Sequence, residues 1–110
     1  MKWIYAAGLA LGMVAGQASA GFNSGADVYS GLQAFDANQM DPRGIMAVGY
    51  VMGVADGLEN DGTLCYPSKV TVGQVVQVAK NYLSLHPEGW NNLASDAIEA
   101  SFLAPWRCKQ

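Results

Sequence analysis

The chain has 110 residues, 51% of them hydrophobic, and a formal net charge of -3. This length and hydrophobic fraction indicate one small domain. Nine acidic residues outnumber six basic ones, so no basic face can neutralise phosphates, which argues against nucleic acid as a partner. With one histidine and two cysteines, we expect neither a metal site nor a cofactor.

The first twenty residues have the three parts of a secretory signal peptide. Lys2 is a short charged region, residues 3–15 are apolar, and Ala18–Ala20 fits the small-residue rule for cleavage. The apolar run is shorter than the ~20 residues of a membrane-spanning helix, so uncleaved anchoring is the less favoured alternative. We expect residues 1–20 to be removed, leaving residues 21–110 as one exported domain without membrane attachment.

The mature chain has two cysteines, Cys65 and Cys108. An even number of cysteines in an exported protein suggests a disulfide, and only one pairing is possible. It would close a loop of about 44 residues and stabilise the fold by roughly 4 kcal/mol in the chain-entropy model. Two free buried thiols, or a metal site with His86 as a third ligand, are the alternatives.

Four helices are predicted, and no strand alternation persists along the chain. The first covers about residues 24–35. The third covers residues 71–86 and opens with a T-x-x-Q capping box, and the fourth covers residues 91–104, with Pro105 expected to stop it. Their apolar residues recur at helical spacing and are expected to face inward: Val28, Leu32, Phe35, Val72, Val75, Val76, Ala79, Tyr82, Leu83, Leu93, Ala94, Ala97, Ile98 and Phe102. The fold class is therefore a small all-α bundle of about four helices with one disulfide.

The second helix is expected to begin at Asp41 and Pro42, an N-cap and a first-turn residue, and to end near Leu58. One face carries its expected buried residues: Ile45, Val48, Met52, Ala55 and Leu58. Beside it, glycine recurs at every fourth position: Gly49, Gly53 and Gly57. Each glycine costs a helix interior ~1 kcal/mol relative to alanine. This glycine strip predicts the close approach of another backbone, from a neighbouring helix of the same chain or from a second subunit, so that Gly53→Leu disrupts the fold or a dimer.

Acidic residues crowd the end of the second helix, where negative charge is unfavourable by ~0.3–1 kcal/mol each. A solvated acidic loop and a surface for a basic partner are both consistent with this. Tyr66, Trp90 and Trp106 lie outside the helical stripes, where aromatic residues either form interface anchors or pack over the ends of the core. Core packing is favoured for Trp106, which lies two residues before Cys108. The candidate partner-binding residues are Glu59, Asp61, Tyr66, Lys69 and Trp90. They lie in two predicted contact regions, the loops of residues 59–69 and 86–92.

No catalytic constellation is evident in the sequence. The serines lack a nucleophile-elbow pattern, and His86 precedes Pro87 at a helix exit, where it is expected to cap carbonyls. We therefore expect no enzymatic activity and no catalytic residues.

Five short motifs occur in a fixed order between Ala47 and Cys108. They are G-Y-x-x-G-x-x-D (Gly49, Tyr50, Gly53 and Asp56), C-x-P from Cys65, the T-x-x-Q-capped helix, Y-L-x-x-H-P ending at His86 and Pro87, and the closing Cys108. Together they resemble the Rap/Tai immunity family. Members are small exported proteins, associated with type VI secretion, that neutralise peptidoglycan amidase effectors.

The resemblance implies an all-helical, often dimeric, periplasmic inhibitor that occludes an amidase active site and uses no cofactor. Many members carry further cysteines, but this chain has other residues at 32–34 and 46–47. We therefore expect the first helix to be loosely held and Gly25→Leu to be mild. The alternative function is a small periplasmic acid-stress chaperone, although the fourteen charged residues of the mature chain, without Lys2, are few for a holdase driven by charge collapse.

Overall fold

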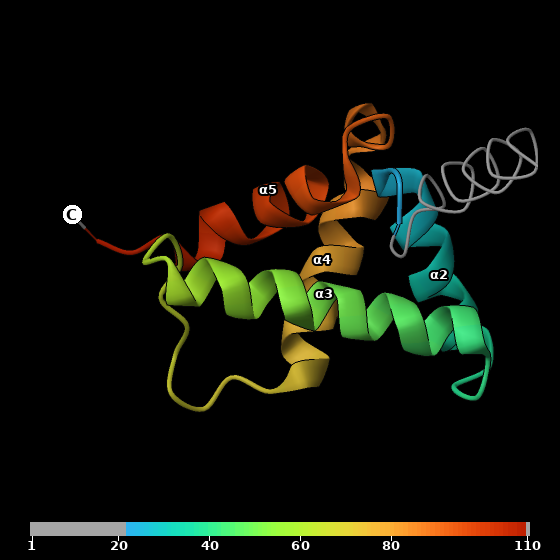
Figure 1. The fold of residues 1–110 in the computed structure, drawn as a ribbon, viewed down its shortest axis with the longest axis horizontal. Helices are drawn as coiled ribbons and strands as arrows, with labels where there is room; N and C mark the ends of the chain where they lie inside the picture. Colours follow the sequence, from blue (N-terminus) through green and yellow to red (C-terminus); the bar gives the residue numbers. More distant parts are fainter. Residues whose placement is uncertain (1–21, 110) are drawn as a thin grey trace, which may run out of the picture.

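The computed structural model describes residues 22–109, so the predicted signal peptide and its cleavage site lie outside the described residues. The helices are α2 (Gly25–Ala37), α3 (Pro42–Asn60), α4 (Val72–Leu85), the 3₁₀ helix η1 (Pro87–Gly89) and α5 (Ala94–Trp106). Residues 22–109 contain only two isolated β-bridges and no strand. The predicted all-α fold is confirmed. In Figure 1, α4 crosses behind α3, α5 runs above α3, and α2 packs near the first turns of α3.

Local capping explains where the first three of these α-helices begin. The side chains of Ser24, Asp41 and Thr71 each accept a backbone N–H of the following turn. In α4 the capping box is complete: the Gln74 N–H donates to Thr71 Oγ1 at 3.1 Å, and Gln74 Oε1 accepts the Thr71 N–H at 2.8 Å. The first residue of each of these three helices is set by capping residues close to it in sequence. The sequence therefore predicted where each helix begins to within one residue.

The fourth helix begins later than predicted, at Ala94. The preceding residues are engaged with α2: the carbonyls of Trp90 and Asn92 accept the N–H groups of Ala26 and Gly25, each at 3.0 Å. These long-range bonds satisfy the free N–H groups that every helix start presents. They hold residues 90–92 outside the helix.

The same helix also ends later than predicted. Pro105 lies inside α5, which continues to Trp106, and the Arg107 N–H still donates to the carbonyl of Leu103 at 3.2 Å. Proline removes one N–H, and in the last turn few further bonds depend on it. The prediction that Pro105 stops the helix is therefore wrong by two residues.

The core is formed by all four α-helices and one loop residue. Its fully buried members are Val28, Leu32, Ala47, Val51, Ala55, Leu64, Val75, Ala79, Leu83, Ala94, Ala97, Ile98 and Phe102. Three residues expected inside are exposed: Ile45 at 50%, Val72 at 53% and Leu93 at 65%. Val72 is the first residue of α4 and Leu93 is the N-cap of α5, where the chain has not yet turned onto the core.

Helix α3 is rotated relative to the predicted face. Its fully buried residues are Gly44, Ala47, Val51 and Ala55, whereas Ile45 is 50% exposed. A Cβ added at Gly44 would lie 2.6 Å from the Phe35 Cα, so α2 passes directly over this glycine. The close α2–α3 contact turns the Gly44 side of α3 inward, and Ile45 therefore faces outward.

Among the described residues, 22–109, the glycine strip has no close neighbour. Gly49, Gly53 and Gly57 are exposed, and a Cβ added at any of them would meet nothing within 4 Å. The prediction of a neighbouring helix of the same chain is therefore wrong. The expectation for Gly25 is wrong too, because its added Cβ would lie 2.5 Å from the Gly89 carbonyl oxygen, so α2 is tightly held at its start.

The predicted disulfide between Cys65 and Cys108 is confirmed, with 4.9 Å between the Cα atoms. It joins the segment after α3 to the chain just beyond α5. The described residues contain no free cysteine and no group of three His, Cys, Asp or Glu side chains that could hold a metal ion. None of their helices has the length and apolar character needed to cross a membrane.

Glycine-to-alanine changes in α3 test which side of this helix is closely packed. Gly44→Ala should lower the free energy of unfolding by about 1–3 kcal/mol, since the methyl group would strike the α2 backbone. Gly53→Ala, on the same helix, should leave it unchanged or raise it by about 0.5–1 kcal/mol through helix propensity. Urea unfolding measures both. Equal losses from the two variants would contradict the orientation of α3.

The disulfide should stabilise the domain strongly, because it closes a long loop around a modest core. Cys65→Ala together with Cys108→Ala should lower the free energy of unfolding by roughly 2–5 kcal/mol. Thermal unfolding of the variant and of the non-reduced parent measures the difference. Mass spectrometry of the non-reduced parent provides the control, and two alkylatable thiols in periplasmic material would refute the bond.

Candidate partner-binding surface

The segment of residues 61–71, which joins α3 to α4, is fixed over its first half. Asp61 caps the end of α3 and accepts the N–H two residues further on, at 2.9 Å. Gly62 follows with φ +83°, the left-handed conformation that glycine adopts freely. Beyond it, the Cys65 N–H donates to the carbonyl of Trp106 at 2.8 Å, next to the disulfide. The segment is thus attached to the end of α5.

Tyr66 fixes the middle of this segment. Its hydroxyl donates to the carbonyl of Ala55 at 3.0 Å, and its ring meets the Trp106 ring edge-on at 5.1 Å between centroids. Burial, and then the charges of Glu59 and Asp56, raise the pKa of Tyr66 to about 12. The phenol therefore stays protonated and keeps donating at physiological pH. The Tyr66 hydroxyl and ring are thus used in contacts within the domain. Only the exposed part of the side chain is available for the predicted partner contact.

An acidic hollow lies between α3, this segment and the start of α4. It measures about 260 Å³, and Asp56, Glu59 and Ser68 are on its lining. No basic residue occupies the last turn of α3. The ion pairs in the described part of the chain lie elsewhere, so Lys69 does not neutralise these acids. Hydrogen bonds from Thr63 lower the pKa of Asp61, which is therefore ionised at neutral pH.

A second, larger hollow lies on the other side of the same segment. It measures about 490 Å³ and is lined mainly by apolar atoms, with Lys69, Gln77 and Trp106 among its residues. Pro67 and Val70 line both hollows. Residues 67–70 therefore form a ridge with an acidic hollow on one side and an apolar one on the other. We call this the 67–70 ridge.

The other predicted contact region, residues 86–92, is built around Trp90. The Trp90 Nε1–H donates to the carbonyl of Leu83 at 2.8 Å, and its ring stacks on Tyr29 at 5.7 Å. The side chain is only half-buried, yet both its polar atom and one ring face are used within the chain. Trp90 thus ties α2 to the end of α4.

His86 caps α4 by its position, but its ring does not bond a helix carbonyl. The ring stacks on Tyr82 at 4.0 Å, and Nδ1 lies 2.8 Å from Glu88 Oε2. The hydrogen bond with His86 lowers the pKa of Glu88. Pro87 then starts η1, which carries the chain toward Trp90. The expectation that the His86 side chain caps carbonyls is wrong, since a nearby carboxylate competes for it.

The model of the Rap1a immunity proteins matches residues 24–108. The chain belongs to this family. The match runs from the N-cap of α2 to the second disulfide cysteine, so it covers nearly all the described residues. A search of curated proteins found no match, and a search of solved structures found none. Membership in the Rap1a family identifies an immunity protein that binds a protein effector, in a family that is generally non-enzymatic.

The residues of the G-Y-x-x-G-x-x-D motif on α3 divide into two groups. Tyr50 is half-buried, with its ring edge-on to Phe22 at 5.4 Å. Gly49 and Gly53 are exposed beside open space, and Asp56 reaches the acidic hollow. The motif therefore combines one packing residue with an exposed face, and fold stability alone does not explain it.

The structure separates the two contact regions that the sequence predicted. Residues 59–69 precede α4 and residues 86–92 follow it, so the two regions lie at opposite ends of a helix about 20 Å long. Figure 1 shows the first below the bundle and the second above it. Glu59, Asp61, Tyr66 and Lys69 belong to one region, and Trp90 belongs to the other.

The sequence did not single out Val70 or Gln77 as site residues, and it favoured a core role for Trp106, although all three line the larger hollow. They come from a loop, from α4 and from the end of α5. No local pattern connects such residues, because only the packing of α4 and α5 against the ridge brings them together. The C-x-P motif was the one local signal for this region, through Pro67.

Two changes at Trp90 separate its stacking from its hydrogen bond. Trp90→Ala should lower the free energy of unfolding by about 2–4 kcal/mol, since it loses the contact with Tyr29 and leaves a cavity. Trp90→Phe keeps a ring and should cost only about 1 kcal/mol, for the lost bond to the Leu83 carbonyl. Denaturant titration measures both. Unchanged stability in Trp90→Ala would show that the side chain is free for a partner.

Proposed function

We propose that this protein is a periplasmic immunity protein that binds a type VI secretion peptidoglycan amidase effector and occludes its active site. The observation that carries this proposal is the Rap1a family match over residues 24–108. The predicted signal peptide supports the periplasm, which is where an enzyme that cuts peptidoglycan would act. Inhibition of this kind needs no bond-making chemistry in the inhibitor, only a well-packed interface of typically ~800 Å² per partner.

The 67–70 ridge is the part of the surface best suited to enter an enzyme cleft. It stands between two hollows, and the Cys65–Cys108 disulfide and the Tyr66 hydrogen bond hold the chain leading into it. A segment that is already ordered loses less conformational freedom on binding. We therefore propose that the ridge, with Lys69 exposed on it, contacts the effector.

The acidic hollow places negative charge beside the 67–70 ridge, and this charge favours a basic partner. Asp56, Glu59 and Asp61 lie exposed on one side of the ridge and lack a basic partner among the described residues. Complementary charges raise association rates and discriminate between partners. We propose that basic residues beside the amidase cleft meet these carboxylates.

We also propose that the protein self-associates as a homodimer. The family resemblance implies it, and the exposed glycine strip supports it, because none of the described helices covers that strip. Self-association and effector inhibition are separate properties, and each is tested by its own measurement.

Co-expression tests the inhibitory function. A candidate amidase effector directed to the periplasm should lyse cells, and this protein, exported with its own leader, should rescue them. Its purified form should bind that amidase and should release no product from peptidoglycan. Failure to bind or to protect against any amidase encoded beside it would reject the proposal.

A charge reversal at the acidic hollow tests the contact region. Glu59→Lys should weaken amidase binding, more at low salt than at high salt, since salt screens exposed charges. Asp96→Lys is the matched control: it makes the same charge change on the first turn of α5 and should have little effect. Surface plasmon resonance at two salt concentrations measures both. Equal weakening by the two variants would place the contact elsewhere.

A further inference from the structure

The larger hollow beside the 67–70 ridge differs in charge from the acidic hollow on the other side. It measures about 490 Å³, within the usual range for binding pockets, and its lining is mainly apolar. Val70, Val78 and Trp106 line its apolar part. No carboxylate is on the lining, and Lys69 is the one charged side chain there. The hollow therefore combines apolar surface with a single positive charge.

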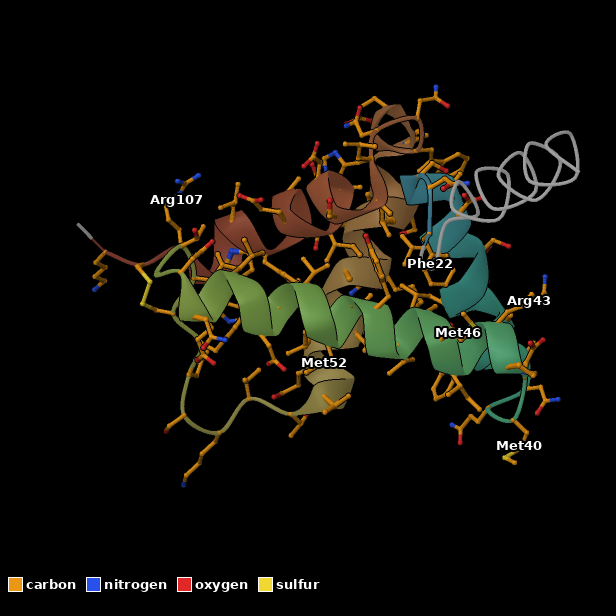
Figure 2. The ribbon with its side chains drawn as sticks, viewed as in Figure 1. Phe22, Met40, Arg43, Met46, Met52 and Arg107 are labelled. Atoms are coloured by element: carbon orange, nitrogen blue, oxygen red, sulfur yellow. A yellow bond between two sulfur atoms is a disulfide. The ribbon has the colours of Figure 1, made fainter. Side chains whose placement is uncertain are left out.

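The charge of Lys69 is not matched by an acid of the described residues. Two other basic residues, Arg43 and Lys80, pair with acids, whereas Lys69 takes part in none of the ion pairs within residues 22–109. Arg107 does not join it: Figure 2 shows the Arg107 side chain pointing upward from the end of α5, while the chain before α4 runs below the bundle. An unpaired ammonium group beside apolar surface favours a partner with negative charge.

Packing inside the domain fixes the wall of the hollow that Trp106 forms. The centroid of its ring lies 5.6 Å from that of the fully buried Phe102 and 5.1 Å from that of Tyr66. Its indole N–H donates to no other described residue and is not buried, whereas that of Trp90 donates to the Leu83 carbonyl. The hollow thus has a preformed aromatic wall and an accessible hydrogen-bond donor.

The position of the larger hollow connects it to the proposed effector contact. Pro67 and Val70 line both hollows, so a partner that holds the 67–70 ridge from both sides covers the larger hollow too. The acidic hollow presents carboxylates to such a partner, and the larger hollow presents Lys69 beside apolar surface. The partner therefore needs a different kind of group on each side of the ridge.

We infer that the larger hollow is an anchor site for the amidase effector, and that it takes an apolar side chain flanked by a carboxylate. This rests on the proposed immunity function and adds the chemistry that the effector presents on the second side of the ridge. The apolar side chain packs against Val70, Val78 and Trp106, and the carboxylate pairs with Lys69. Side chains that fill such pockets carry much of the energy of protein interfaces.

The two hollows together also fix the direction in which the effector lies across the ridge. In the inferred direction its basic group meets the acidic hollow and its carboxylate meets Lys69. The reverse direction would bring like charges together on both sides, which is unfavourable.

A charge reversal at Lys69 tests the inferred carboxylate, with the amidase that passes the co-expression test as the probe. Lys69→Glu should weaken amidase binding at least about tenfold, and more at low salt, because it would place two carboxylates together. Arg43→Glu is the matched control: it makes the same charge change in the first turn of α3, at the other end of the molecule in Figure 2, and should have little effect. Surface plasmon resonance measures both. Unchanged or tighter binding of Lys69→Glu would overturn the inference.

Two small amphiphiles test the chemistry of the hollow without an effector. Removal of Trp3 with the leader makes Trp106 the only tryptophan of the mature Trp90→Phe protein. Its fluorescence should report that octanoate binds about threefold more tightly than octyltrimethylammonium, which has the same apolar chain and a positive head group. Lys69→Gln in the same background should abolish this preference. Equal affinities for the two amphiphiles, or no saturable change, would overturn the inferred chemistry.

The outcomes separate this inference from the proposals above. An amidase that binds the parent and the Lys69→Glu protein equally well overturns the anchor site and leaves the immunity function intact. A protein that neither binds nor neutralises any amidase overturns both.

Other occupants of the larger hollow would be recognised by two further measurements. Saturating octanoate should weaken amidase binding to the parent protein, and unchanged affinity would assign the hollow to a small amphipathic carboxylate instead. Analytical ultracentrifugation gives the oligomeric state, and a parent dimer that Lys69→Glu dissociates would assign the hollow to a second copy. Either result overturns the effector anchor.

Discussion

The close contact between α2 and α3 determines most of this structure. Gly31 and Gly44 leave no space for a side chain between the two helices, so Ala47 and Phe35 pack almost against the opposite backbone. This contact fixes the rotation of α3 about its own axis. As a result, Ala47, Val51 and Ala55 enter the core, and Gly49, Gly53 and Gly57 are directed away from it. The exposed face of α3 is thus a consequence of a contact on its other side.

The candidate effector surface depends on a different constraint. A domain of this size has a modest core, and a long connection such as residues 61–71 gains little order from burial alone. Here the disulfide, the buried Leu64 and the Tyr66 hydroxyl tie the connection to α5 and α3. The chain can therefore present the 67–70 ridge in one conformation. An inhibitor that blocks a cleft benefits from such preorganisation, because its binding energy is not spent on ordering a loop.

The two proposed interaction surfaces use different chemistry. The ridge region combines fixed shape with uncompensated acidic charge, which suits recognition of a specific basic partner. The exposed side of α3 carries Ile45 and Met46 and open backbone at Gly49 and Gly53, which is a more apolar chemistry. Met52 and Asp56 of α3 line the acidic hollow, so the two surfaces adjoin there.

The sequence by itself determined the features that depend on neighbouring residues or on chain connectivity. The all-α class and the capped starts of the first three predicted helices could be predicted, because periodicity and caps depend on residues close in sequence. The cysteine pairing could be predicted because two cysteines allow only one. The sequence also carried the family motifs. The tertiary structure decided which side of α3 is buried, why Gly25 tolerates no side chain, and how Trp90 and Tyr66 are used. Each of these depends on atoms far apart in the chain: Phe35 above Gly44, Gly89 beside Gly25, Leu83 below Trp90 and Ala55 beside Tyr66. Helical periodicity places residues on a common face, but only packing against another element decides whether that face points inward.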